Sequence, residues 1–116
     1  MNLPILRMTI AHQQMILECR KCSTLRKERF GCGIYRMIGR VGAGEKASRG
    51  CCEVLDSRQV WRKDFDDAGW QRLAQDEGYD TVKAFEVTLR RLHYGAFLRG
   101  EKPMWLHEIR AAKETP

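Results

Sequence analysis

The sequence predicts a single α+β domain, in which a small, mostly antiparallel sheet or barrel carries helices at its sides. Segments with strand patterns outnumber those with helical patterns, in the order β-α-β-β-β-α-α-β. Strands and helices do not alternate regularly, which argues against a parallel sheet. The 116 residues match about one domain. We therefore treat 1–116 as one unit, with a core over 3–110 and a tail over 111–116.

The first half of the chain is predicted to be mainly strand. Four segments have strand patterns: 3–10, 22–26, 34–41 and 51–61. A turn or bulge is expected near Asp56 and Ser57. Thr9 is a candidate N-cap for a helix over 11–18, and three polar residues of that helix are expected to face water: His12, Gln13 and Gln14. The glycine-rich segment 42–50 is predicted to be a loop.

The second half is predicted to contain two helices and a final strand. Residues 70–77 place their apolar side chains on one helical side, and Gly78 is expected to end that helix. Asp80 is a candidate N-cap for a helix over 81–93, which has the clearest helical period in the chain. Two segments complete this half: a loop over 95–102 and a strand over 103–110.

Composition and charge limit the function classes. Hydrophobic residues make up 43% and charged residues 31% of the chain, as in globular proteins rather than disordered ones. No run approaches the roughly 20 apolar residues that cross a membrane, and the start lacks a signal-peptide pattern. We expect a cytoplasmic monomer with no membrane partner. The net charge of +6 favours polyanionic partners such as RNA, DNA or nucleotides.

The five cysteines suggest a metal or redox alternative, but their spacing gives it little support. They are Cys19, Cys22, Cys32, Cys51 and Cys52. Cys19 and Cys22 have metal-like spacing, yet a zinc site needs two further ligands of matching geometry. Adjacent residues of a strand point to opposite faces, so Cys51 and Cys52 would not easily reach one metal. We expect free thiols and no metal. The Gly42-Ala43-Gly44 segment lacks the third glycine of a dinucleotide fingerprint, so no cofactor is expected either.

The segment Met15–Arg29 concentrates charged and nucleophilic side chains. It runs from an apolar helix through a turn into the predicted strand 22–26, and it is either a reactive or anion-binding site or a solvated turn. In that strand, three side chains are expected to point the same way: Cys22, Thr24 and Arg26.

The run Ile16–Arg26 resembles the signature of the ASCH domain, a relative of the PUA fold. Members have an apolar helix followed by Gly-x-Lys-Thr-x-Thr-x-Arg or a close variant. The helical segment 70–92 and the strand 104–110 also resemble the family, so the resemblance covers about residues 3–110. Cys19 stands where glycine is usual, and Cys22 where threonine often stands. A residue other than glycine at position 19 makes a left-handed turn harder to adopt.

The resemblance implies a small β-barrel with flanking helices, a cleft on one side, and a role with RNA or modified nucleosides. Small bacterial members are amidohydrolases that remove the acetyl group of N4-acetylcytidine with a lysine, a threonine and a glutamate. The corresponding catalytic residues here would be Lys21, Thr24 and Glu77. Four residues are expected to bind substrate or nucleic acid: Arg20, Arg26, Lys46 and Arg49. A non-catalytic RNA-binding module with the same basic cleft is the alternative.

Amide hydrolysis requires Thr24 to have a base nearby, and Lys21 is the obvious candidate. Free lysine titrates near pH 10.4, so its pKa would have to be lowered. The positive charges of Arg20 and Arg26 would lower it, whereas pairing with Glu77 would raise it. Glu77 is also a candidate proton shuttle to the leaving nitrogen.

Overall fold

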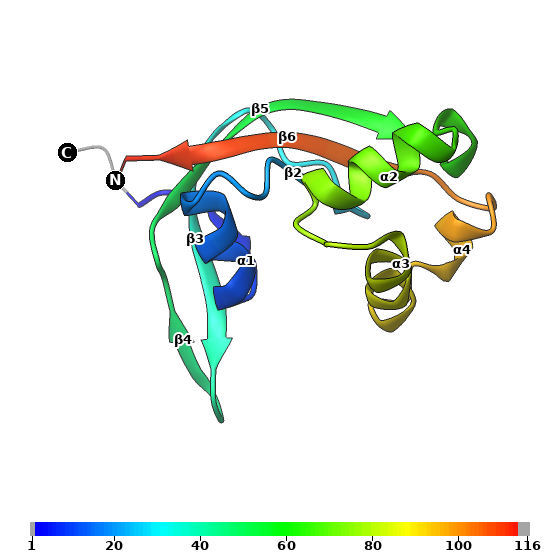
Figure 1. Cartoon of the computed structure of the whole chain (residues 1–116). Helices are drawn as coiled ribbons and strands as arrows, with labels where there is room; N and C mark the ends of the chain where they lie inside the picture. The colour runs from blue at the N-terminus through cyan, green and yellow to red at the C-terminus, as the bar shows by residue number, and fades with distance from the viewer. Residues whose placement is uncertain (1, 114–116) are drawn as a thin grey trace.

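The structure is a computed structural model that describes residues 2–113, and it has an α+β architecture (Figure 1). The elements, in chain order, are β1 (Ile5–Arg7), α1 (Ile10–Leu17), β2 (Ser23–Arg26), β3 (Gly33–Val41), β4 (Glu45–Ala47), β5 (Cys51–Val60), a 3₁₀ helix (Arg62–Asp64), α2 (Asp67–Asp76), α3 (Val82–Arg91), α4 (Gly95–Leu98) and β6 (Met104–Ala112). No helix in the described chain is long and apolar enough to cross a membrane.

One mixed sheet of six strands forms the scaffold. Its strand order is β1-β3-β5-β6-β2, with β4 paired to β3. Only β1 and β3 pair in parallel, and the other described pairs are antiparallel. The long strands β5 and β6 run side by side across the molecule, and the β3–β4 hairpin projects away from them (Figure 1). The predicted, mostly antiparallel arrangement is therefore confirmed.

The sheet is not closed into the barrel that the family resemblance implied. Within residues 2–113, β1 and β2 are the two edges of the path and share no backbone ladder. Strand β1 is short because Thr9 caps α1, its hydroxyl oxygen accepting a hydrogen bond from His12 N at 3.3 Å. One side chain joins the edges instead, since Arg26 Nη2 donates to the Arg7 carbonyl oxygen at 2.7 Å.

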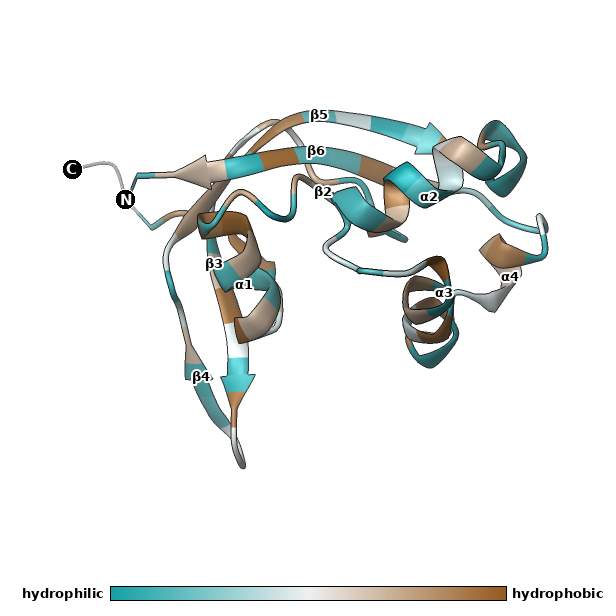
Figure 2. Cartoon of the chain, in the orientation of Figure 1, coloured by the Kyte–Doolittle hydropathy of each residue, from teal (hydrophilic) through white to brown (hydrophobic). Residues whose placement is uncertain are grey.

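Two hydrophobic clusters lie at opposite ends of the sheet. The helical cluster combines α2, α3 and α4 with β2, β5 and β6; its buried members include Trp70, Phe85, Phe97 and Leu106. The α1 cluster joins α1 to β1, β3, β5 and β6; its members include Leu6, Ile16, Met37 and Ile109. Hydrophobic stretches follow these two regions along the ribbon (Figure 2). The apolar residues are therefore split between two packing centres.

Several predicted boundaries in the first half were wrong. The strand predicted over 3–10 ends at Arg7, because Thr9 begins a helix and Ile10 lies within it. The loop predicted over 42–50 contains β4, which pairs back on β3 through a turn. The bulge predicted near Asp56 is confirmed by a register shift between Val54 and Asp56.

The second half shows similar differences. The helix predicted over 70–77 begins at Asp67, where the Asp66 side chain accepts a hydrogen bond from Gly69 N. Thr81 rather than Asp80 caps α3, because its hydroxyl oxygen accepts from Ala84 N at 3.1 Å. The predicted loop over 95–102 includes α4, and β6 continues to Ala112 into the predicted tail. Residues 114–116 of that tail lie outside the described residues.

Candidate functional site

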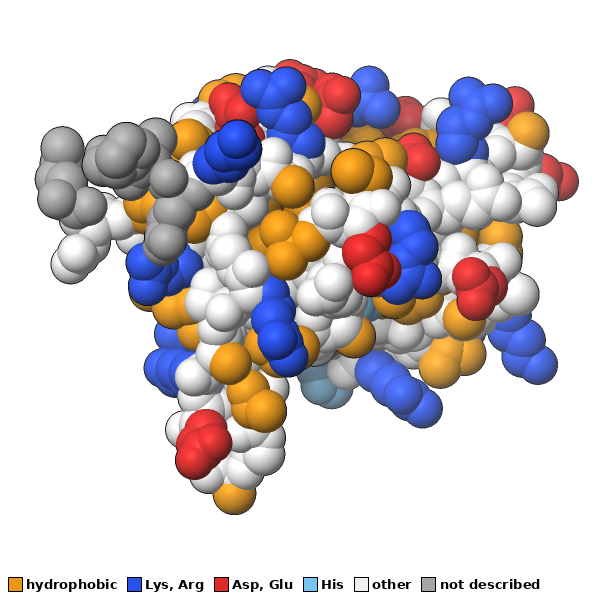
Figure 3. All heavy atoms as spheres, turned by 60° about the vertical axis from the view of Figure 1, so that its left-hand side comes forward, with side chains coloured by type: hydrophobic (Ala, Val, Ile, Leu, Met, Phe, Trp, Pro, Cys, Tyr) orange, Lys and Arg blue, Asp and Glu red, His pale blue; other side chains and the backbone are white. Residues whose placement is uncertain are grey.

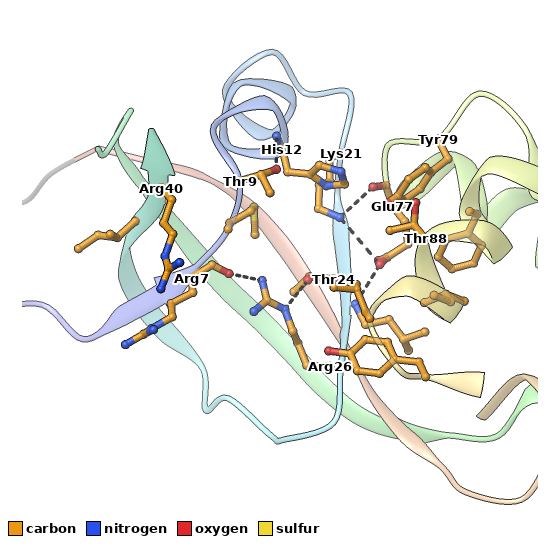
Figure 4. A pocket seen from close by; sticks show the side chains of 18 of the residues that line it. Arg7, Thr9, His12, Lys21, Thr24, Arg26, Arg40, Glu77, Tyr79 and Thr88 are labelled. Carbon is orange, nitrogen blue, oxygen red and sulfur yellow. Dashed lines mark hydrogen bonds and ion pairs between the residues drawn. The ribbon is translucent and has the colours of Figure 1, made fainter. Parts of the chain in front are cut away.

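A cavity of about 520 Å³ lies between α1, α3 and the edge strands β1 and β2. On one side its polar lining includes Lys21, Thr24, Arg26 and Glu77, and on another it includes Arg7, Arg40 and Lys46. Aromatic and apolar side chains complete the wall, including Tyr79, Phe85, Leu89 and Tyr94. Figure 4 labels ten of the lining residues and shows that they come from several elements around the cavity. A cavity of this size matches small-molecule sites in general.

Lys21 and Glu77 form a buried pair at this cavity. Each residue is 4% exposed. Lys21 Nζ donates to the Glu77 backbone carbonyl oxygen at 2.8 Å and lies 3.8 Å from Glu77 Oε1. The carboxylate also accepts hydrogen bonds from Leu25 N at 3.0 Å and from the Ser23 hydroxyl. The carboxylate is thus held by three partners, as a buried charge requires.

The ends of two helices bring this pair together. Lys21 follows the C-terminus of α1, and Glu77 is the C-cap residue of α2. Cys22 N donates to the carbonyl oxygen of Asp76 at 2.8 Å, which fixes one helix end against the other. Residues far apart in the sequence therefore become neighbours through backbone contacts at helix termini.

Burial lowers the pKa of Lys21 because a desolvated ammonium is disfavoured. The Glu77 carboxylate opposes this change, and the positive charge of Arg26 adds to it. The net direction is a pKa below that of free lysine. Such a lysine loses its proton more readily than an exposed one.

Thr24 is held from two sides. Arg26 Nε donates to Thr24 Oγ1 at 2.9 Å, so the hydroxyl proton is left for another acceptor. Behind the strand, His107 is fully buried, and its Nδ1 lies 3.1 Å from the Thr24 carbonyl oxygen. His107 Nε2 accepts from Phe30 N at 2.9 Å, which assigns the proton to Nδ1 as a donor to Thr24.

His12 and Gln13 do not face water, contrary to the prediction. His12 lines the cavity, and its ring lies 5.4 Å from that of Tyr79. Burial, with the charges of Lys21 and Arg26, lowers the pKa of His12 to about 4, so its ring is neutral near pH 7. Gln13 is fully buried, with its amide bonded to Met8 O at 2.9 Å. The Gln13 amide also binds the backbone of Ala47 and Arg49, so the segment around β4 covers this residue, whereas Tyr79 covers His12.

The four predicted ligand-binding residues separate into two groups. Arg26 and Lys46 line the cavity. Arg20 is exposed and ion-paired with Glu18 at 2.8 Å, and Arg49 is exposed; neither lines the cavity.

Sequence reasoning missed several residues of the wall: Arg7, His12, Arg40, Tyr79 and Tyr94. For Arg40 the sequence did offer a signal, because Arg36 and Arg40 fall on one face of the predicted strand 34–41. Most come from separate elements, and no local spacing connects them.

The cysteines are not arranged as a metal site. Cys19 and Cys22 are exposed, and Cys51 and Cys52 are buried. No group of three His, Cys, Asp or Glu side chains within residues 2–113 could hold a metal ion. Partial desolvation and the neighbouring Asp76 carboxylate raise the pKa of Cys22 to about 11, which keeps the thiol protonated. A protonated thiol is a poor nucleophile and a poor metal ligand.

Comparison with known proteins supports the fold alone. Protein EF3133 from Enterococcus faecalis V583, of the family DUF984, has a similar structure with a TM-score of 0.60 at 10% sequence identity. The similarity covers 86% of this chain and 66% of the other chain, so the present chain spans slightly less than two thirds of that protein. No family model and no curated protein matches the sequence.

Proposed function

We propose that this protein is an ASCH-type amidohydrolase that removes the acyl group from an N4-acylated cytidine. The observation that carries the proposal is the buried Lys21–Glu77 pair in the same cavity as Thr24, whose hydroxyl oxygen accepts from Arg26. This set supplies a nucleophile, a base and a cation for a developing oxyanion, which are the groups that acyl transfer needs.

In the first half of the reaction, Thr24 Oγ1 attacks the carbonyl carbon of the amide. Neutral Lys21 takes the hydroxyl proton, and Arg26 stabilises the negative charge that develops on oxygen. Collapse of the tetrahedral intermediate breaks the bond between carbon and N4, and the Lys21 ammonium returns the proton to that nitrogen. The products of this step are cytidine and acyl-Thr24.

In the second half, Lys21 takes a proton from a water molecule, which attacks the acyl-Thr24 ester. The ester bond breaks, Thr24 regains its proton from Lys21, and the carboxylic acid leaves. Glu77 touches no reacting atom in this scheme. It positions Lys21 through its carbonyl oxygen and carboxylate and moderates the lysine pKa.

The aromatic side of the cavity suits the cytosine ring. Tyr79 and Tyr94 line it together with Phe85, and stacking of a base on an aromatic ring contributes about 1–3 kcal/mol. The neutral ring of His12 beside Tyr79 extends this surface without adding a charge.

The test is release of acetate from N4-acetylcytidine by the purified protein. Thr24→Val keeps the shape of the side chain and removes the nucleophile, so kcat/KM should fall by at least about 100-fold. Ser57→Ala is the control, because it removes a half-buried strand hydroxyl that binds the Phe30 carbonyl oxygen and does not line the cavity. A Thr24→Val variant that folds and turns over at the wild-type rate would contradict the mechanism.

A non-catalytic RNA-binding module is the second candidate. The observation in its favour is that Lys21 Nζ donates to the Glu77 carbonyl oxygen rather than to Thr24. If the wild-type protein releases no acetate, and the wild-type and Thr24→Val proteins retain RNA equally well, the binding function replaces the enzymatic one.

A further inference from the structure

Three cationic side chains on one side of the cavity have no carboxylate partner among the described residues. Arg7 on β1, Arg40 on β3 and Lys46 on β4 all line it. Within residues 2–113, none of the three has a carboxylate within ion-pair distance, although other basic residues of the chain do. The sheet thus brings unpaired positive charge from three strands to one place.

The strand register keeps these charges close together. Arg40 and Lys46 lie directly opposite each other in the β3–β4 hairpin. Arg7 pairs with Ile38, two residues before Arg40 in β3. Figure 4 shows the side chains of Arg7 and Arg40 on the same side of the cavity. Like charges placed directly opposite across strands destabilise a sheet, and a bound anion would offset that repulsion.

The opposite part of the cavity has a different character. Figure 4 shows Tyr79 across the cavity from Arg7 and Arg40, with neutral His12 and the reactive groups Lys21 and Thr24 between them. Tyr94 also belongs to the lining. One cavity therefore combines an aromatic surface for a base with a cationic surface for an oxyanion. A nucleotide has these two features, joined by a ribose.

We propose that the basic side binds a ribose phosphate, so that the ligand is a nucleoside monophosphate rather than a free nucleoside. Arginine suits this task because its planar fork binds phosphate oxygens in pairs. The inference rests on the proposed function for the placement of the base.

A mononucleotide fits better than an RNA strand. Proteins that bind single strands use a charged groove that follows several successive phosphates. Here the unpaired cations gather at one cavity, and Arg20 and Arg49 lie outside its lining. On the face drawn in Figure 3, basic side chains are scattered among apolar ones and form no continuous stripe.

Calorimetric titration with unacylated ligands tests this site without requiring catalysis. The probes are cytidine, its 5′- and 3′-monophosphates, and a short single-stranded oligoribonucleotide. For the wild-type protein, one monophosphate should bind at least about tenfold more tightly than cytidine. The double variant Arg7→Gln/Arg40→Gln should lose that preference and keep its affinity for cytidine. Arg72→Gln, an exposed arginine on α2, is the control and should bind like the wild type.

Three results would overturn the inference. Cytidine and both monophosphates could bind equally, or the preference could survive in the double variant. The oligoribonucleotide could bind more tightly than either monophosphate with a steeper salt dependence, which would indicate RNA instead. Phosphate-dependent binding through Arg7 and Arg40 without acetate release would support this site and contradict the proposed reaction.

Discussion

At the scale of single residues, the Lys21–Glu77 pair is the most unusual feature of the protein. Burying a charged pair costs desolvation free energy that mutual attraction only partly offsets. Each partner here is nearly inaccessible to solvent. The pair has a second effect, because the same burial that costs stability lowers the pKa of Lys21. A perturbed lysine in a cavity is typical of functional sites.

The Glu77→Gln substitution tests whether pairing with Glu77 changes the pKa of Lys21. If neutral Lys21 is the base, kcat/KM for acetate release rises with pH as Lys21 loses its proton. The Glu77 carboxylate raises the pKa of Lys21, so its removal should move that rise to lower pH. The measurement is the pH–rate profile of the variant beside the wild type.

Glu108→Gln is the control for this experiment, because it removes an exposed carboxylate on β6 and should leave the profile in place. A profile of the Glu77→Gln protein that coincides with the wild type, or moves to higher pH, would show that Lys21 is not the titrating base.

At the scale of elements, the helix C-termini build the site. Each described α-helix ends in the Schellman pattern, in which the residue after the C-cap adopts a positive φ. These residues are Cys19, Gly78, His93 and Gly100, with φ of 61°, 95°, 65° and 76°. A Cβ at Gly78 would lie 2.7 Å from the Met15 sulfur, so the Met15 side chain would have to shift to accept it.

Cys19→Gly is expected to stabilise the protein. A residue other than glycine in the left-handed region costs about 1–2 kcal/mol, and glycine loses about 0.4–1 kcal/mol through the greater freedom of the unfolded chain. The free energy of unfolding should therefore rise by about 0.5–1 kcal/mol, as measured by urea denaturation. Cys19→Ala removes the thiol but keeps Cβ and should give no such gain. Equal stability of the two variants would mean that the conformation at residue 19 carries little strain.

Element types were largely predictable, and their ends were less so. Apolar periodicity predicted the long strands and α2 and α3, because these elements bury a regular face. It missed β4 and α4, which are three and four residues long and have too few residues to show a period. It also assigned Gln13 to solvent, because a pattern cannot show which strands will cover a helix.

At the scale of the whole molecule, the cavity lies where the sheet fails to close. Strands β1 and β2 are its edges, and Arg26 reaches from one to the other while it also bonds Thr24. The motif residues Lys21, Thr24 and Arg26 could be named from the sequence because they lie within one short run. Their meeting with Glu77 was inferred only through the family resemblance. That the motif residues share a cavity with Arg7 and Arg40 depends on long-range strand pairing, which no local spacing encodes.

Locating the acyl group during turnover tests most directly whether Thr24 is the nucleophile. The protein would be mixed with N4-acetylcytidine, quenched in acid within the first turnover, digested and analysed by mass spectrometry. We expect one acetyl group on the peptide that carries Thr24, placed on the Thr24 oxygen and absent from the Thr24→Val protein. Acetate released at the full rate with Thr24 unmodified, or an acetyl group on Lys21, would contradict this expectation.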